Sequence, residues 1–163
     1  YAQTDALTGL YNKETTEQLT DELLSEDENK SHAFLILDVD CFKQINDIYG
    51  HAVGDIVLQK FGKLLKGTFR EGDILGRIGG DEFGVIMKNI QTKDIAMKKA
   101  EELLAKTQAY KIDELKGNNI SISIGISTAP QDGDCYMDLY KRADQALYQA
   151  KRSGKARVCN YFS

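Results

Sequence analysis

The stretch Gly79-Gly80-Asp81-Glu82-Phe83 lies between two short apolar runs, residues 74–78 and residues 83–87. Two glycines between strand-like runs indicate a β-hairpin, because a two-residue turn of type I′ or II′ requires a positive φ that glycine adopts without steric cost. We therefore expect the hairpin turn at Gly79 and Gly80. Successive side chains of a strand point to opposite faces, so Asp81 and Glu82 are expected to point in different directions.

The two acids at this turn have no lysine beside them in the sequence. A hairpin tip with bare glycine backbone and a carboxylate suits the binding of a phosphate group and its metal ion. The alternative is a solvated acidic turn, which the preferences of turn residues favour when the motif is considered alone. The rest of the chain decides between the two.

The composition predicts one compact globular domain covering residues 1–163. Hydrophobic residues make up 42% and charged residues 28%, with a single proline, which excludes a disordered or fibrous chain. The formal net charge of −4 argues against binding to a nucleic-acid polymer, which usually requires a basic face.

The three cysteines are odd in number and far apart in the sequence, so we expect free thiols in a reducing, cytoplasmic setting. No apolar run approaches the roughly 18 residues of a membrane span, and we expect no membrane contact from this segment. We expect the chain to be a fragment of a longer sensory protein, which could be the cytoplasmic part of a membrane-bound sensor.

Hydrophobic periodicity predicts the order helix, strand, helix, hairpin, helix, strand, helix, strand. Residues 34–37 are apolar without alternation, as in a strand that is buried on both faces, whereas residues 120–127 alternate isoleucine with serine or glycine and predict a strand with one polar face. The expected fold class is α+β, with a mixed central β-sheet flanked by helices. The helices are expected at residues 13–25 (capped by Asn12), 53–65, 92–110 and 139–150, with a helical turn at 41–47 and an edge strand at 157–161.

Asp38 follows the predicted central strand, and Asp81 lies at the hairpin tip. Both are positions where a sheet presents ligand groups. Mg²⁺ prefers carboxylate and carbonyl oxygens and completes its shell with water and substrate phosphates. Two carboxylates from separate strands would supply part of such a shell, although aspartates at strand ends also serve as helix caps and turn formers.

Several other polar residues fit a nucleotide. Lys43, Lys151 and Lys155 could supply positive charge to a triphosphate, or complement the dipole at a helix end. Asn46 and Asp55 combine an amide with a carboxylate, which suits the donors of a guanine edge, although both residue types are also common helix caps. His51, next to Gly50, is more often structural than catalytic.

Taken together, these residues resemble the GGDEF family of diguanylate cyclases from about Thr4 to Asn160, nearly the whole chain. Four separated motifs carry the resemblance: Asp5-x-Leu7-Thr8-Gly9-Leu10-x-Asn12, Asp38-x-Asp40-x-Phe42-Lys43-x-Ile45-Asn46-Asp47-x-x-Gly50-His51-x-x-Gly54-Asp55, Arg77-x-Gly79-Gly80-Asp81-Glu82-Phe83, and Arg142-Ala143-Asp144-x-Ala146-Leu147-Tyr148-x-Ala150-Lys151-x-x-Gly154.

The resemblance implies a fold similar to the adenylate cyclase catalytic core. It also implies the condensation of two GTP molecules into cyclic di-GMP and two pyrophosphates, with Mg²⁺ or Mn²⁺, across a homodimer. By the same resemblance, the metal ligands would be Asp38, the Val39 carbonyl, Asp81 and Glu82, and the catalytic residues Asp81, Glu82 and Lys43. The substrate-binding residues would be Phe42, Asn46, His51, Asp55, Gly79, Gly80, Lys151 and Lys155.

A further match lies before the hairpin, where five residues separate Arg70-x-x-Asp73 from Gly79. This spacing is similar to that of the family's product-inhibition site, in which arginine stacks on guanine and aspartate accepts from its Watson–Crick edge. Considered alone, the pattern is common at helix exits.

The sequence departs from the family pattern at several positions. Lys13 and Lys155 stand where arginine is usual, and lysine does not offer a bidentate fork to phosphate. The first acid of the hairpin is Asp81, a variant that also occurs in the family. We favour an active cyclase because Asp38, Asp81 and Glu82 are intact. Two alternatives remain: a catalytically silent module that binds GTP or cyclic di-GMP, and a cyclase with altered base selectivity.

Overall fold

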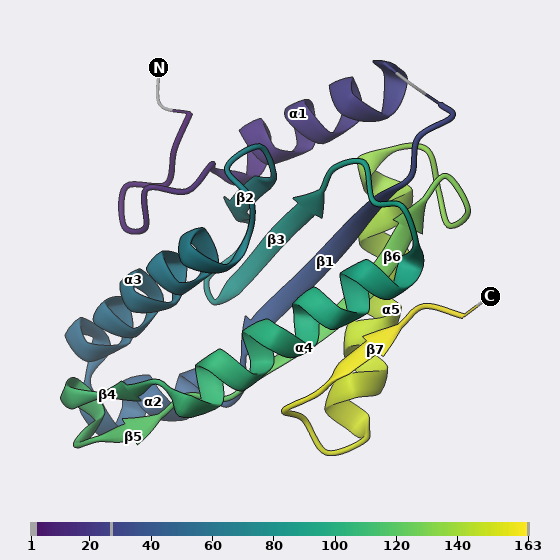
Figure 1. The fold of residues 1–163 in the computed structure, drawn as a ribbon. Coiled ribbons are helices and arrows are strands. Elements are labelled where there is room, and N and C mark those ends of the chain that lie inside the picture. The colour runs from purple at the N-terminus through teal and green to yellow at the C-terminus, as the bar shows by residue number, and fades with distance from the viewer. Residues whose placement is uncertain (1–2, 27, 163) are drawn as a thin grey trace.

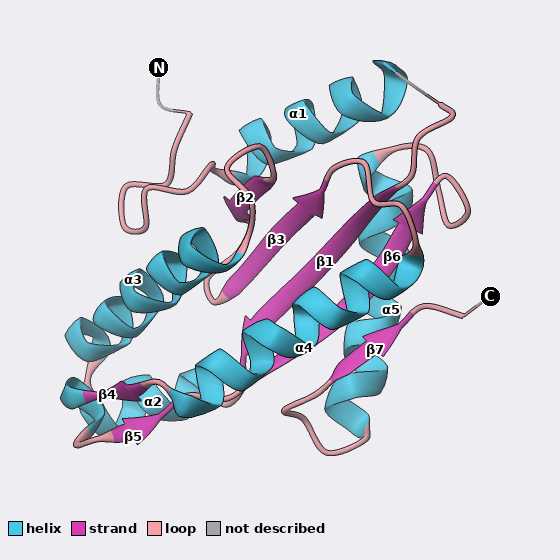
Figure 2. Ribbon diagram, viewed as in Figure 1, coloured by secondary structure: helices cyan, strands magenta, loops and turns pink. Residues whose placement is uncertain are grey.

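The computed structural model describes residues 3–26 and 28–162 and contains a five-stranded sheet between two layers of helices (Figures 1 and 2). The strand order is β2-β3-β1-β6-β7. The central strand β1 (His32–Val39) runs antiparallel to both β3 (Glu82–Met87) and β6 (Ile122–Ala129). The edge strands are β2 (Ile74–Arg77), antiparallel to β3, and β7 (Val158–Asn160), parallel to β6. The sheet is therefore mixed, as the sequence predicts.

Alternate residues of β1 separate the core into two halves. Leu35 and Leu37 belong to the cluster beneath α3 (His51–Thr68) and α4 (Lys93–Ala109). Phe34 and Ile36 belong to the cluster beneath α1 (Lys13–Glu26) and α5 (Tyr136–Arg152). Because all eight residues of β1 are buried, the expectation of a strand covered on both faces is confirmed.

The chain forms two smaller structures at the end of the sheet where β1 terminates. The short helix α2 (Phe42–Tyr49) follows β1 and joins α3 at Gly50. A small sheet of β4 (Lys111–Ile112) and β5 (Asn118–Asn119) encloses the 3₁₀ helix η1 (Asp113–Leu115). It follows α4 and contacts α3 through η1. The sequence does not predict this small sheet, because two-residue strands carry no periodicity.

Strand β6 carries its serines on one face, as the alternation predicts, and that face is buried too, because β6 is buried throughout. Helix α5 covers its serines, and the hydroxyl of Ser127 donates to the carbonyl of Leu139 at 2.8 Å. The helix packs this closely because Gly125 has no side chain: a Cβ there would lie 2.2 Å from the carbonyl oxygen of Ala143. This close packing brings α5 to the strands that carry the acids.

The hairpin forms, but its predicted two-residue turn is wrong. Strand β2 ends at Arg77 and β3 begins at Glu82, so the connection is longer, and both Ile78 and Gly79 donate their N–H groups to the carbonyl of Glu82. The four glycines with positive φ are Gly9, Gly50, Gly117 and Gly154; Gly79 and Gly80 are not among them. The longer loop removes the requirement for left-handed glycines.

Candidate active site

Four predicted residues meet where β1 ends. Asp38 lies directly opposite Glu82 on the neighbouring strand, and such cross-strand pairs project from the same face of a sheet. The N–H of Val39 donates to the main-chain carbonyl of Asp81 at 3.4 Å. The hairpin tip is thereby held against the end of β1, and Asp81 lies close enough to Asp38 for its charge to raise the pKa of the Asp38 carboxyl.

Asp38 is the most buried of these acids, with 7% of its surface exposed. Its Oδ2 accepts from Nζ of Lys151 at 2.5 Å, while Oδ1 is buried and has no hydrogen-bond partner within the described residues. Burial raises the pKa of Asp38, against the hydrogen bond and charge of Lys151, and the nearby charges of Asp81 and Asp40 raise it further.

A buried carboxylate oxygen without a partner is costly unless a ligand compensates it. Around the Asp38 oxygen lie further groups of the kind that Mg²⁺ binds: the carboxylates of Asp81 and Glu82 and the main chain of Val39. The residues therefore fit a divalent cation. Nζ of Lys151 neutralises the cluster in part when no cation is bound.

Glu82 is held by α5. The hydroxyl of Tyr140 donates to Oε1 of Glu82 at 2.8 Å. Burial raises the pKa of Glu82, the hydrogen bond from Tyr140 lowers it, and the charges of Asp144 and Asp38 raise it again. No role for Tyr140 is predicted from the sequence, since a tyrosine at helical spacing is equally typical of the core.

Asp40 supports the site although it was assigned no role from the sequence. Its carboxylate accepts from the hydroxyls of Ser121 and Ser123 at 2.5 and 2.6 Å and from the N–H of Ala156 at 3.1 Å. These bonds tie the end of β1 to β6 and to the loop after α5. The alternation of serines before and in β6 indicates one polar face, but it does not show that an acid is buried against that face.

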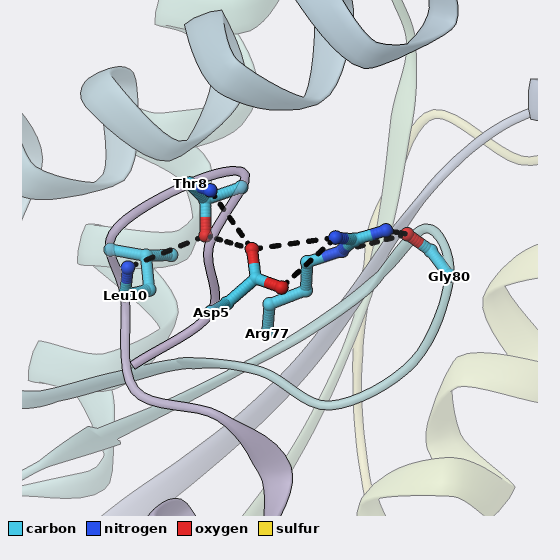
Figure 3. Close-up of polar contacts among 5 residues, drawn as sticks. All are labelled: Asp5, Thr8, Leu10, Arg77 and Gly80. Atoms are coloured by element: carbon cyan, nitrogen blue, oxygen red, sulfur yellow. Dashed lines mark hydrogen bonds and ion pairs between the residues drawn. The ribbon is translucent and has the colours of Figure 1, made fainter. Parts of the chain in front are cut away.

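The hairpin tip is anchored from the other side by Arg77 (Figure 3). Its guanidinium donates to both carboxylate oxygens of Asp5 at 3.1 and 3.3 Å and to the carbonyl of Gly80 at 2.8 and 3.0 Å. Asp5 also accepts from the N–H and hydroxyl of Thr8. Burial tends to raise the pKa of Asp5, but the bonds from Thr8 and the charge of Arg77 outweigh it and lower this pKa.

The predicted guanine-binding residues lie on α2 and α3. Gly54 faces Asn46, and a Cβ on Gly54 would lie 1.9 Å from Oδ1 of Asn46 and 3.3 Å from the ring of Phe42. The missing side chain therefore makes room for the Asn46 amide between the helices. His51 and Asp55, on the first two turns of α3, are exposed, so their side chains are accessible to a ligand.

The predicted phosphate-binding lysines differ in their surroundings. Lys43, on α2, is exposed. Lys151 is already paired with Asp38. Nζ of Lys155 lies 3.3 Å from Sγ of Cys41, at the start of α2. Lys151 therefore lies near the acids, and Lys155 lies near the start of α2.

Arg70 and Asp73 form an ion pair at 3.2 Å beside a cavity of about 420 Å³. Asp73 is buried and accepts from the N–H groups of Arg70 and Lys88, while the guanidinium of Arg70 is 61% exposed and donates to the carbonyl of Lys88. The aspartate is thus committed to the main chain, and the arginine is the member of the pair that is accessible to a ligand.

Residues 2–157 match the family described as the diguanylate cyclase, GGDEF domain. The chain belongs to the GGDEF family. It is 38% identical to Diguanylate cyclase A of Treponema denticola, in an alignment that covers 82% of this chain but only 36% of that protein. The chain spans less than half the length of the curated relatives that it matches first.

Solved GGDEF structures share the fold. The GGDEF domain of TpbB from Pseudomonas aeruginosa is 33% identical, with a TM-score of 0.92, 98% of this chain covered and 94% of that one. The GGDEF domain of DgcB from Caulobacter crescentus, solved in complex with c-di-GMP, is 28% identical, with a TM-score of 0.89, 98% of this chain covered and 96% of that one.

Within the described residues, no helix is both long enough and apolar enough to cross a membrane.

Proposed function

We propose that this GGDEF domain is a diguanylate cyclase that condenses two GTP molecules into cyclic di-GMP and two pyrophosphates. The observation that carries the proposal is the buried Oδ1 of Asp38, which has no hydrogen-bond partner among the residues that the structure describes and lies beside Asp81 and Glu82. A structural carboxylate in this position would have both oxygens satisfied. The named cyclase relatives support the same reaction.

Asp38, Asp81, Glu82 and the Val39 carbonyl would hold Mg²⁺ or Mn²⁺. The ion would polarise the α-phosphate and neutralise the leaving pyrophosphate. Asp81, at the tip of the hairpin, is the candidate acceptor for the proton of the attacking 3′-hydroxyl. Arg77 keeps that tip in place through Gly80.

The remaining side chains would bind the nucleotide. Asp55 would accept from the N–H donors of the guanine edge, and the Asn46 amide would accept from them or donate to a guanine acceptor, with Phe42 and His51 beside them. Lys43, Lys151 and Lys155 face the phosphates, and the main chain at Gly79 and Gly80 allows close approach. Lys151, whose Nζ contacts Asp38 in the absence of a cation, would be able to contact a phosphate oxygen once a cation compensates the acids.

One domain holds one GTP, so a second copy of the chain must bring the other GTP in the opposite orientation. Attached sensory or regulatory domains would control this encounter, and the GTP substrate places the reaction in the cytoplasm. Cyclic di-GMP would bind at Arg70 and Asp73 and inhibit the enzyme. The exposed guanidinium beside a cavity supports the inhibitory site.

Replacing Asp81 with asparagine tests the proposal. Asp81→Asn removes a metal ligand and the proton acceptor while keeping the size of the side chain, so we expect turnover to fall by at least about 100-fold with an unchanged melting temperature. Asp134→Asn, an exposed aspartate in the loop before α5, is the matched control and should leave turnover unchanged. Full activity of Asp81→Asn would refute the assignment of this site.

A further inference from the structure

The acids of the proposed metal site are contacted by a single helix, α5. Lys151 reaches Oδ2 of Asp38, and Tyr140 reaches Oε1 of Glu82. These two residues are eleven positions apart, which corresponds to about 16 Å along a helix axis. Since Asp38 and Glu82 are direct neighbours across two strands, both long side chains must lean toward the same point. Helix α5 therefore contacts the pair of carboxylates with two side chains, one from near each end of the helix.

Tyr140 is fixed by other aromatic rings. Its ring stacks on Tyr136, one turn earlier, with centroids 5.8 Å apart and planes 29° apart. Tyr136 in turn packs edge-on against Phe34 at 5.5 Å. Phe34 projects from the same face of β1 as Asp38, because the two are four residues apart in one strand. The position of the Tyr140 hydroxyl is thus set by the strand that carries the central acid.

A glutamate that binds metal must hold its carboxylate in one orientation. Three rotatable bonds separate the carboxylate of glutamate from its main chain, and ordering them opposes binding. The Tyr140 hydroxyl occupies Oε1 and restricts those rotations before a metal arrives. Hydrogen bonds of this kind to a ligating carboxylate orient the ligand and strengthen metal binding.

We propose that Tyr140 is a positioning residue that orients Glu82 for the divalent cation. This inference rests on the proposed function, because it requires that Glu82 take part in the metal site. Tyr140 itself would touch neither substrate nor cation: its hydroxyl bonds to Oε1 and leaves the other oxygen of Glu82 available to the cation.

The test is Mn²⁺ binding, measured by electron paramagnetic resonance of the free ion. The protein is saturated with a GTP analogue that has a methylene group between the α- and β-phosphorus atoms, so that no turnover occurs. Tyr140→Phe keeps the stacked ring and removes only the hydroxyl. We expect it to weaken Mn²⁺ binding by about tenfold, with an unchanged melting temperature. Tyr140→Leu, which removes the ring as well, should weaken binding at least as much.

Tyr136→Phe is the matched control. Its hydroxyl is buried and has no partner within the described part of the chain, so its removal should leave Mn²⁺ affinity unchanged. A second control places Tyr140→Phe in a Glu82→Gln background. In that background, Tyr140→Phe should cause little further loss of Mn²⁺ affinity. Such non-additivity identifies residues that act through one another.

The outcomes separate the two claims. Tight Mn²⁺ binding that Asp38→Asn weakens but Tyr140→Phe does not would overturn the role of Tyr140 and leave the metal site standing. Equal loss of affinity in Tyr140→Phe and Tyr136→Phe would also overturn it, since the effect would then not depend on the hydroxyl that bonds to Glu82. Mn²⁺ binding that Asp38→Asn leaves unchanged would overturn the metal site itself.

Discussion

At the scale of single residues, the site consists of acids with very different partners. Both carboxylate oxygens of Asp40 accept hydrogen bonds from the protein, whereas Oδ1 of Asp38 has no hydrogen-bond partner within residues 3–26 and 28–162. This contrast separates a structural acid from a ligand-binding one, although the two are only two positions apart. The sequence motif includes both aspartates and does not distinguish them, because the partners come from β6 and from the loop after α5.

Arg77 gives a prediction at this scale. Its planar guanidinium bridges Asp5 and the carbonyl of Gly80, which a lysine cannot do with a single ammonium group. We expect Arg77→Lys to lower the free energy of unfolding by about 1–3 kcal/mol and to reduce turnover more than it weakens GTP binding, since the hairpin tip carries Asp81. Denaturant titration and steady-state kinetics measure the two effects.

Arg157→Lys is the control for this change, because the Nε of Arg157 bonds only locally, to the carbonyl of Lys155. This variant should retain nearly full stability. If Arg77→Lys matched the wild-type protein in both stability and turnover, the bridge would have no part in holding the hairpin.

At the scale of secondary structure, two glycines, one in a strand and one in a helix, determine how closely neighbouring elements approach each other. Gly125 allows α5 onto β6, and Gly54 allows Asn46 between α2 and α3. Both glycines were visible in the sequence, but their function was not. A glycine in a periodic pattern signals close approach without saying which element approaches, and that information comes only from the tertiary structure.

Gly54→Ala is expected to impair recognition of guanine rather than folding. The new Cβ would displace Oδ1 of Asn46, while alanine favours the helix by about 0.5–1 kcal/mol over glycine. We therefore expect GTP affinity to fall by about tenfold or more, consistent with the loss of one hydrogen-bonded contact of about 1.4 kcal/mol. Calorimetric titration with a non-reacting GTP analogue measures this loss.

The same helix provides the matched control, since a Cβ on Gly67 would meet nothing within 4 Å. Gly67→Ala should retain GTP affinity and raise the free energy of unfolding by about 0.4–1 kcal/mol. Undiminished GTP affinity in Gly54→Ala would show that Asn46 does not bind the guanine.

The elements themselves were largely predictable. The buried run of β1, the cap of α1, where Oδ1 of Asn12 accepts from the N–H of Thr15 at 2.9 Å, and the spacing of α5 are all local signals. One prediction failed because distant parts of the chain determine the local structure: Gly79 and Gly80 lie not in a two-residue turn but in a longer connection held by Arg77 and Val39. The serines of β6 lie on one face of the strand as predicted, but only the tertiary structure shows that α5 covers that face.

At the scale of the whole molecule, residues far apart in the sequence converge on one end of the sheet. The chain returns to that end after β1, at the hairpin, and again at the end of α5 (Figure 1). The motifs predicted which residues belong to the site, and the fold explains why they meet. The contributions of Tyr140, Asp5 and Gly54 could not be predicted, because each acts through a contact across many residues of sequence.

The site on one domain would bind a single GTP, so the account requires a second copy for catalysis. The most direct measurement incubates the protein with GTP and Mg²⁺ at increasing protein concentration and separates the nucleotides by chromatography. We predict that cyclic di-GMP forms at a rate that rises faster than linearly with protein concentration and that chelation of the metal abolishes it. No cyclic di-GMP, even when a fused coiled coil forces dimerisation, would contradict the account and indicate a nucleotide-binding module without turnover.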